Sequence, residues 1–310
     1  MIEHTARPLP RGGKLFCFGF GYCAEALMAR LQTARLQTAI PDAAFSVAGT
    51  RRIVPQTQTG PVALAAFDGR ARTPVVAELL TGTTHLLVSI PPDADGDPAL
   101  RWHASDLAAL TSLVWIGYFS TVGVYGDAAG GVVDETSPLK PQSPRGARRV
   151  LAEEQWRAFG RETGKRVEVF RLPGIYGPGR SALDTVRDGT ARRIIKPGQV
   201  FNRIHVADIA GTLERAMTLA TASRSLLVDT FNVVDDEPAP PQDVITYAAH
   251  LLCVTPPPEI PFADAQLSPM AQSFYGESKR VSNVRLKSAL GVKLMYPTYR
   301  EGLAALHRGS

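Results

Sequence analysis

Two glycines follow a short apolar segment near the start of the chain, and their spacing is suited to binding a phosphate. Residues 14–18 (KLFCF) run into Gly19-x-Gly21-x-x-Ala24, and residues 22–37 have helical character. Glycines in this arrangement allow a tight turn and let the backbone approach a pyrophosphate at the N-terminus of the helix. A glycine turn of this kind is a weak signal when it stands alone. The candidate contacts to such a group are Gly19, Phe20, Gly21 and Tyr22.

Basic residues, not acidic ones, follow the second expected strand. In dinucleotide-binding folds a carboxylate at this point bonds the ribose hydroxyls, whereas an arginine accommodates a 2′-phosphate. The chain reads Thr50-Arg51-Arg52 here, and no Asp or Glu occurs in residues 43–67. The alternative is that both arginines are solvated loop side chains. Their position favours phosphate binding, so the sequence predicts NADP as the cofactor in preference to NAD.

The ends of the third and fourth expected strands supply further candidate contacts. Asp68 follows the third strand, where its side chain would reach the adenine amino group, although an aspartate there also caps turns. Ser89, Ile90 and Pro91 close the fourth strand, where the backbone would pass the second ribose. Prolines also end strands for purely structural reasons, which leaves that alternative open.

The elements that would position these residues alternate regularly along the first half of the chain. Short β-like runs occupy residues 14–18, 45–48, 62–67, 85–90, 113–118 and 166–170. Helical segments occupy residues 22–37, 73–81, 98–111 and 147–163, with a further helix at 207–220 and a strand at 230–234. Such alternation predicts an α/β fold in which a doubly wound parallel sheet of the Rossmann type carries helices on both faces.

Glycine and proline become frequent after Arg171, which indicates a different, loop-rich texture. We interpret this part as a small C-terminal substrate lobe, because ligands of open α/β sheets bind beside the carboxyl ends of the strands. The expected division is a flexible leader over 1–13, a Rossmann domain over 14–172 with 206–236, and a substrate lobe over 173–205 and 237–310.

Composition restricts the class of protein. The net charge of +5 over 310 residues is modest and spread along the chain, whereas nucleic-acid binders concentrate basic residues with aromatics. Cys17, Cys23 and Cys253 form no spaced set with histidines, which favours reduced thiols and no metal site. No apolar run has the length of a membrane span. We therefore expect a cytoplasmic protein without nucleic-acid or membrane partners.

Three longer motifs follow one another along the chain: YFSTVGVYGD at 118–127, RLPGIYGPG at 171–179 and RIHVADIA at 203–210. In this order they resemble the extended short-chain dehydrogenase/reductase family, which includes epimerases and dehydratases, and the resemblance covers nearly the whole chain. It implies an NAD(P)-binding oxidoreductase or epimerase, with a homodimer as the family expectation. It also implies that Ser120, Pro173 and Gly174 lie beside the cofactor.

The resemblance further assigns catalytic positions, and one of them is altered. Thr121 matches the family's catalytic hydroxyl, which would hydrogen-bond the substrate oxygen, although it also suits a strand-end cap. The family's Tyr-x-x-x-Lys motif falls on Arg145 and Arg149. Arginine keeps its proton at physiological pH, so Arg145 cannot exchange a proton with substrate. Arg149 can still supply positive charge beside the cofactor ribose. The chain thus resembles the atypical branch of the family.

The proton donor is not identified by the sequence. Tyr125 is the first candidate, with Tyr176 and His205 behind it, and each is also explained as a packed structural side chain. Tyr176, Arg180 and Arg203 are candidate substrate contacts, because arginines near the cleft would hold an anion. We therefore expect an oxidoreductase or epimerase-like protein acting on a small, polar, anionic substrate such as a sugar nucleotide. The alternative is a non-catalytic sensor or scaffold that binds NADP.

Overall fold

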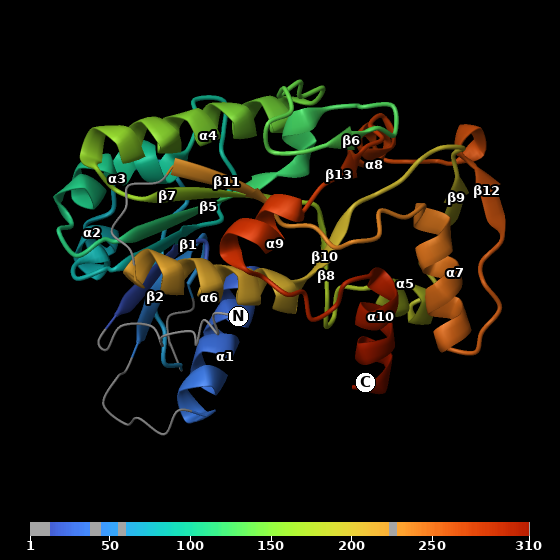
Figure 1. The fold of residues 1–310 in the computed structure, drawn as a ribbon, viewed down its shortest axis with the longest axis horizontal. Coiled ribbons are helices and arrows are strands. Elements are labelled where there is room, and N and C mark those ends of the chain that lie inside the picture. Colours follow the sequence, from blue (N-terminus) through green and yellow to red (C-terminus); the bar gives the residue numbers. More distant parts are fainter. Residues whose placement is uncertain (1–12, 38–44, 55–59, 223–227, 310) are drawn as a thin grey trace. The chain divides into compact units, whose positions relative to one another are not determined.

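The structure, a computed structural model, describes residues 13–37, 45–54, 60–222 and 228–309 (Figure 1). The expected leader over residues 1–13 lies almost wholly outside this part. The described residues divide into two compact units. The first is drawn from Met1–Ser120, Arg148–Phe170 and Ala210–Phe231, and the second from Thr121–Ala147, Arg171–Ile209 and Asn232–Ser310.

The first unit is built on one seven-stranded sheet. Its strands are β1 (Lys14–Phe18), β2 (Ser46–Arg51), β3 (Ala63–Ala66), β4 (His85–Val88), β5 (Trp115–Thr121), β7 (Val167–Leu172) and β11 (Val228–Asn232). They are ordered β11-β7-β5-β4-β1-β2-β3, and the pairs from β5 to β3 are parallel. The order reverses beside β1, where Rossmann folds bind their ligand. The predicted fold class is confirmed.

Helices cover both faces of this sheet. They are α1 (Tyr22–Gln37), α2 (Pro74–Leu80), α3 (Pro98–Ala109), α4 (Pro144–Thr163) and α6 (Val206–Ala222). Figure 1 shows α3 and α4 on one face and α1 and α6 on the other, which is the doubly wound arrangement. Between the layers, Phe16, Phe18, Leu86 and Trp156 belong to one buried apolar cluster. Each such side chain contributes about 1.5–3 kcal/mol when it leaves water.

The second unit contains three two-stranded parallel sheets and several short helices. The sheets pair β6 (Val132–Val133) with β13 (Arg280–Val281), β8 (Gly174–Tyr176) with β10 (Arg203–His205), and β9 (Arg193–Ile195) with β12 (Glu259–Pro261). The helices are η1 (Val122–Tyr125), α5 (Ala182–Arg187), α7 (Pro241–Leu251), η2 (Phe262–Asp264), α8 (Pro269–Tyr275), α9 (Val284–Leu290) and α10 (Tyr299–Arg308).

The structure differs from the expected lobe in two ways. Residues 121–147 belong to the second unit, because Ala128 N donates to Ser278 O at 3.1 Å and β6 pairs with β13. The tail is also more helical than a loop-rich texture implies. Pro241 and Pro269 are the first residues of α7 and α8, a position where proline's missing N–H and fixed φ favour the helix.

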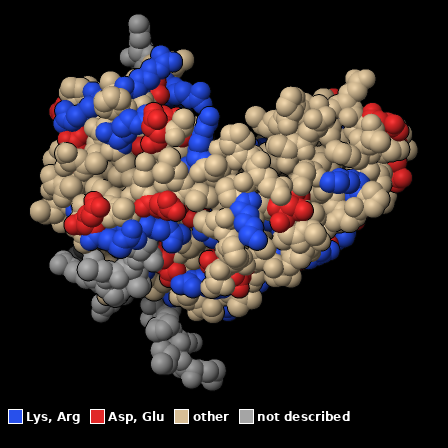
Figure 2. Space-filling view, turned by 90° about the horizontal axis from the view of Figure 1, so that it is seen from above, with Lys and Arg blue, Asp and Glu red and all other residues tan. Residues whose placement is uncertain are grey.

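The surface charge and the character of the helices are relevant to nucleic-acid and membrane partners. On the face drawn in Figure 2, the basic and acidic side chains of the described residues are interspersed, and they do not form one basic stripe. Within the described ranges, none of the helices combines the length and apolar character required to cross a membrane.

Candidate functional site

The glycine corner after β1 has the geometry of a phosphate cradle. Gly19 has φ +90°, and a Cβ placed there would lie 2.6 Å from Ser89 Oγ and 3.0 Å from Ile90 Cγ2. Only glycine therefore fits at this position without strain. A Cβ placed on Gly21 would meet no atom within 4 Å, so the corner is open on that side. The corner fits a dinucleotide pyrophosphate, which would occupy the open side at the start of α1.

The end of β2 holds this corner in place through main-chain and side-chain bonds. Gly19 N donates to Thr50 Oγ1 at 3.0 Å, and Phe20 N donates to Thr50 O at 2.7 Å. Arg51 Nε donates to Phe20 O at 2.9 Å. The two residues predicted to contact the cofactor from β2 thus also shape the turn that would receive it.

A carboxylate reaches Arg51 from the neighbouring helix. Arg51 Nη2 forms an ion pair with Glu25 Oε1 in the first turn of α1, and the guanidinium lies 5.9 Å from the centre of the Phe20 ring. Arg52 is exposed beside it. Glu25 is not among the cofactor contacts predicted from the sequence, because it lies on α1 and not at the end of β2.

The other predicted cofactor contacts of the first unit also lie at strand ends. Ser89 Oγ donates to Gly19 O at 2.7 Å, which ties β4 to the glycine corner. Ile90 is half-buried and Pro91 exposed. Asp68 is exposed and accepts from Arg70 N at 3.0 Å, which is the turn-capping alternative.

The carboxyl end of β5 carries a buried polar cluster. Ser120 Oγ donates to Glu153 Oε1 at 2.5 Å, and both residues are buried. Arg149 Nη1 donates to the Phe119 carbonyl and lies 3.3 Å from Tyr118 Oη. Arg149, the residue at the family's lysine position, thus lies where β5 ends.

The carboxyl group of Asp97, near Arg149, has a raised pKa. Burial raises the pKa of Asp97 to about 6, against the opposing effects of its hydrogen bonds and the Arg149 charge. Asp97 caps α3, accepting from Ala99 N at 2.8 Å. Its position in the cap indicates a structural role.

In the second unit, Thr121 and Tyr125 both have hydrogen-bond partners. Thr121 Oγ1 accepts from Gly123 N at 3.1 Å and so caps η1. Tyr125 Oη donates to Asn232 Oδ1 at 2.7 Å and accepts from Arg171 Nη1 at 2.8 Å. Burial raises the pKa of Tyr125 above its usual value. This closed network favours the packing interpretation of Tyr125.

The other positions considered for proton transfer are also engaged or unsuited. Arg145, at the family's tyrosine position, is exposed and stacks over Phe274 with 4.6 Å between guanidinium carbon and ring centre. His205 is buried, its Nδ1 accepts from Ala207 N at 3.1 Å, and burial lowers its pKa to about 4. Tyr176 Oη lies 3.4 Å from the Thr298 carbonyl.

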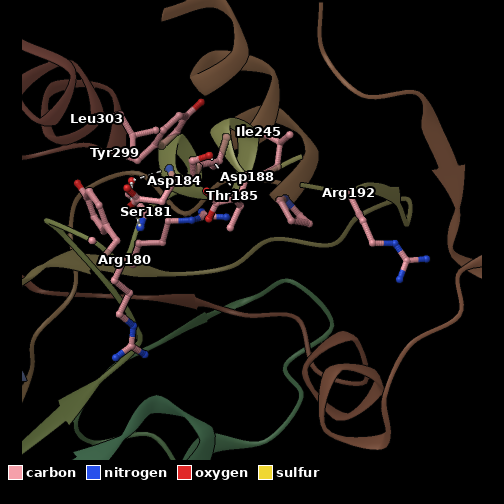
Figure 3. A pocket seen from close by; sticks show the side chains of 15 residues that line it. Arg180, Ser181, Asp184, Thr185, Asp188, Arg192, Ile245, Tyr299 and Leu303 are labelled. Carbon is pink, nitrogen blue, oxygen red and sulfur yellow. Dashed lines mark hydrogen bonds between the residues drawn. The ribbon is translucent and has the colours of Figure 1, made fainter. Parts of the chain in front are cut away.

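A pocket of about 510 Å³ in the second unit brings together the three predicted substrate contacts, Tyr176, Arg180 and Arg203. Figure 3 shows Tyr299 and Leu303 on one side, with Ser181, Asp184, Thr185 and Asp188 beside them. The buried hydroxyl of Tyr299 has no hydrogen-bond partner among the described residues. The pocket therefore combines an aromatic and aliphatic wall with arginines and a free hydroxyl.

Arg203 is anchored at the edge of this pocket. Its Nη1 donates to Phe201 O at 2.9 Å and Ala239 O at 3.2 Å. Burial lowers the pKa of Arg203, against the opposing charge of Asp235. In the adjoining β8 segment, Gly174 N donates to Asn202 O at 3.3 Å. Pro173, which precedes it, is half-buried.

A doubly wound parallel sheet with a glycine corner at its reversal point defines an α/β protein of the Rossmann class. Residues 106–220 match the NAD dependent epimerase/dehydratase family. The chain is similar to this family over these residues, and its fold is shared with solved structures described as epimerases. Among the described residues, no three or more His, Cys, Asp or Glu side chains are grouped to hold a metal ion.

Several known proteins are similar to this chain. A conserved protein of unknown function from Silicibacter pomeroyi DSS is 43% identical, with a TM-score of 0.79 over 96% of this chain and 99% of that one. UDP-glucuronic acid 4-epimerase from Bacillus cereus, solved with NAD, is 15% identical, with a TM-score of 0.72 over 95% of this chain and 96% of that one. The second likeness concerns the fold alone.

A curated relative matches over a shorter stretch. The 3-diazoavenalumate denitrifying reductase of a Streptomyces species is 28% identical over 188 residues, which cover 56% of this chain. The match spans 58% of the length of that relative.

Proposed function

We propose that this chain is an NADP-dependent oxidoreductase that acts on a small, polar, anionic substrate. The observation that carries the proposal is the glycine corner, in which Gly19 is wedged against Ser89 and Ile90 while Gly21 is open. A backbone cradle of this shape at the N-terminus of α1 is suited to a dinucleotide pyrophosphate. The match of residues 106–220 supports the same interpretation, since that family is described as NAD dependent epimerases and dehydratases.

The end of β2 favours NADP. Arg51 and Arg52 occupy the position where the two cofactors differ, and the strand itself ends without a carboxylate. Arginine's planar fork suits a phosphate better than a hydroxyl. NAD is the competing outcome, because the Bacillus cereus epimerase was solved with NAD.

The chain's own residues have defined tasks in such a reaction. NADPH, when bound, supplies a hydride. Thr121 already accepts the Gly123 N–H, so its hydroxyl hydrogen remains to be donated to a substrate oxygen. Arg149 supplies positive charge at the end of β5, and the Ser120–Glu153 bond fixes the adjoining backbone. The pocket beside Arg203 holds the anionic part of the substrate.

The direction of the reaction is proposed to be reductive. The relative from Streptomyces that is named a reductase supports this direction. Because Arg145 stands where the family has its tyrosine, the proposal assigns no proton transfer to that position.

Substitution of Gly21 by alanine tests the cradle. The added methyl has space in the protein but would occupy the side on which a pyrophosphate approaches. Overpacking of about 1–3 kcal/mol corresponds to roughly a fivefold to 150-fold loss of NADPH affinity, without loss of thermal stability. Calorimetric titration measures the affinity.

Gly60→Ala is the matched control, since a Cβ at Gly60 also meets no atom within 4 Å. Gly60 precedes β3, at the sheet edge opposite the glycine corner, because β2 and β3 run parallel. We expect this variant to bind NADPH as the unmodified chain does. If Gly21→Ala binds NADPH as tightly as the unmodified chain, the pyrophosphate does not bind at this corner.

A further inference from the structure

We propose that Glu25 sets the coenzyme preference of this protein by partly neutralising Arg51. The inference rests on the proposed function, because it concerns the 2′-phosphate that distinguishes NADP from NAD. Glu25 is in the first turn of α1, and Arg51 is the last residue of β2. The pair joins residues 26 positions apart, at the point where the adenosine ribose would lie.

The guanidinium of Arg51 is held on two sides. Its Nε donates to Phe20 O at 2.9 Å, and one Nη2 hydrogen is directed at Glu25 Oε1. An arginine has five N–H donors, so three remain after these two bonds among the residues that the structure describes. Two donors on one guanidinium edge are enough for bidentate contact with a phosphate. A 2′-phosphate can therefore bind without breaking the Glu25–Arg51 pair.

The Glu25–Arg51 pair opposes binding of a 2′-phosphate through electrostatic repulsion. A phosphate bound to the free edge of Arg51 lies a few ångströms from the Glu25 carboxylate, and the two negative charges repel. Both side chains are partly exposed, at 39% for Arg51 and 49% for Glu25, so water and salt screen this repulsion. A carboxylate also accepts hydrogen bonds from ribose hydroxyls, which favours NAD at the same position. The Glu25–Arg51 pair should therefore reduce the difference between the affinity for NADP and the affinity for NAD.

Glu25→Gln tests this inference because it removes the charge and keeps the size of the side chain. Titrating the protein with NADPH and with NADH at low and moderate salt measures the preference directly. We expect the affinity for NADPH to rise about tenfold at low salt, and the rise to shrink as salt is added. The affinity for NADH should stay equal or fall.

Glu214→Gln is the matched control. Glu214 Oε2 pairs with Arg30 Nε at 2.6 Å, and Arg30 also lies on α1, but this pair joins α1 to α6. We expect Glu214→Gln to leave both affinities unchanged. The inference is overturned if Glu25→Gln leaves the ratio of the two affinities unchanged or lowers it. It is equally overturned if Glu214→Gln produces the same rise.

Titration of the unmodified protein with both nucleotides distinguishes a failure of this inference from a failure of the proposed function. If it binds neither nucleotide, the proposed function fails and the inference fails with it. If it binds either one, the nucleotide site stands, and the comparison of the two variants decides the role of Glu25 alone.

Discussion

Substitution of Tyr125 by phenylalanine distinguishes a structural tyrosine from a proton donor. The change removes one hydroxyl that donates to Asn232 Oδ1 at 2.7 Å and accepts from Arg171 Nη1 at 2.8 Å. Tyr125 is 3% exposed and Arg171 is 2% exposed, so water does not readily replace the lost bonds. The ring itself remains, including its contact with the Arg171 guanidinium at 4.9 Å.

The expected cost follows from these two bonds. A buried hydrogen bond to a charged group contributes about 1.5–3 kcal/mol, and leaving a neutral acceptor unsatisfied costs about 1 kcal/mol more. We therefore expect the free energy of unfolding to fall by about 2.5–4 kcal/mol. For a chain of 310 residues that corresponds to a midpoint roughly 4–6 °C lower. Affinity for NADPH should be unchanged, because Tyr125, Asn232 and Arg171 are not among the predicted cofactor contacts.

Thermal and urea unfolding of Tyr125→Phe measure this cost. Tyr247→Phe is the control, because among the described residues the Tyr247 hydroxyl makes only a long, exposed contact of 3.4 Å with Arg300 O. We expect that variant to unfold within about 0.5 kcal/mol of the unmodified protein. A Tyr125→Phe variant as stable as the control would refute the reasoning, and would make Tyr125 a candidate proton donor again.

Two further predictions concern stability. Gly19→Ala should destabilise the fold by about 2–5 kcal/mol in urea unfolding, because its φ of +90° is strained for alanine and its Cβ would lie 2.6 Å from Ser89 Oγ; unfolding like the unmodified chain would contradict the tight packing of this turn. Burial lowers the pKa of His85 to about 4, from an ordinary value near 6.5. The unfolded chain therefore binds the proton first, so the stability from neutral His85 is complete above about pH 6.5 and is lost as the pH falls towards 4, by about 3 kcal/mol. His85→Gln should reduce this pH dependence in urea unfolding, and an unchanged dependence would count against the assignment.

Much of the first unit is predictable from the sequence. The expected strand at residues 14–18 coincides with β1, and the expected strand at 85–90 contains β4. Parallel strands buried on both faces are continuous apolar runs, and these stand out against the helices between them. The start of α4 is less predictable. It begins at Pro144, three residues before the expected start, because a proline at the first helical position resembles a loop residue in the sequence.

The second unit is harder to predict for physical reasons. β8 and β9 have three residues each, which is too short to show a period of two. Their partners β10 and β12 are distant in sequence, so pairing depends on the whole unit. Apolar residues such as Leu303 form a core there only after α5, α7 and α10 come together.

The candidate site shows the same contrast. The sequence is enough to predict Arg51 as a candidate cofactor contact. The glycine turn marks the first strand, and Arg51 ends the second strand. Glu25 is not predictable in the same way, because it meets Arg51 only through the packing of α1 beside β2. The sequence also suggests Tyr125 as a donor, whereas its partners Arg171 and Asn232 become visible only in three dimensions.

Calorimetric titration of the unmodified protein with NADPH and, separately, with NADH tests the central claim most directly. The glycine corner and the arginines that follow β2 predict saturable binding of one molecule of NADPH, with weaker binding of NADH. Binding of NADH alone would keep the nucleotide site and contradict the choice of NADP. Binding of neither would contradict the proposed function.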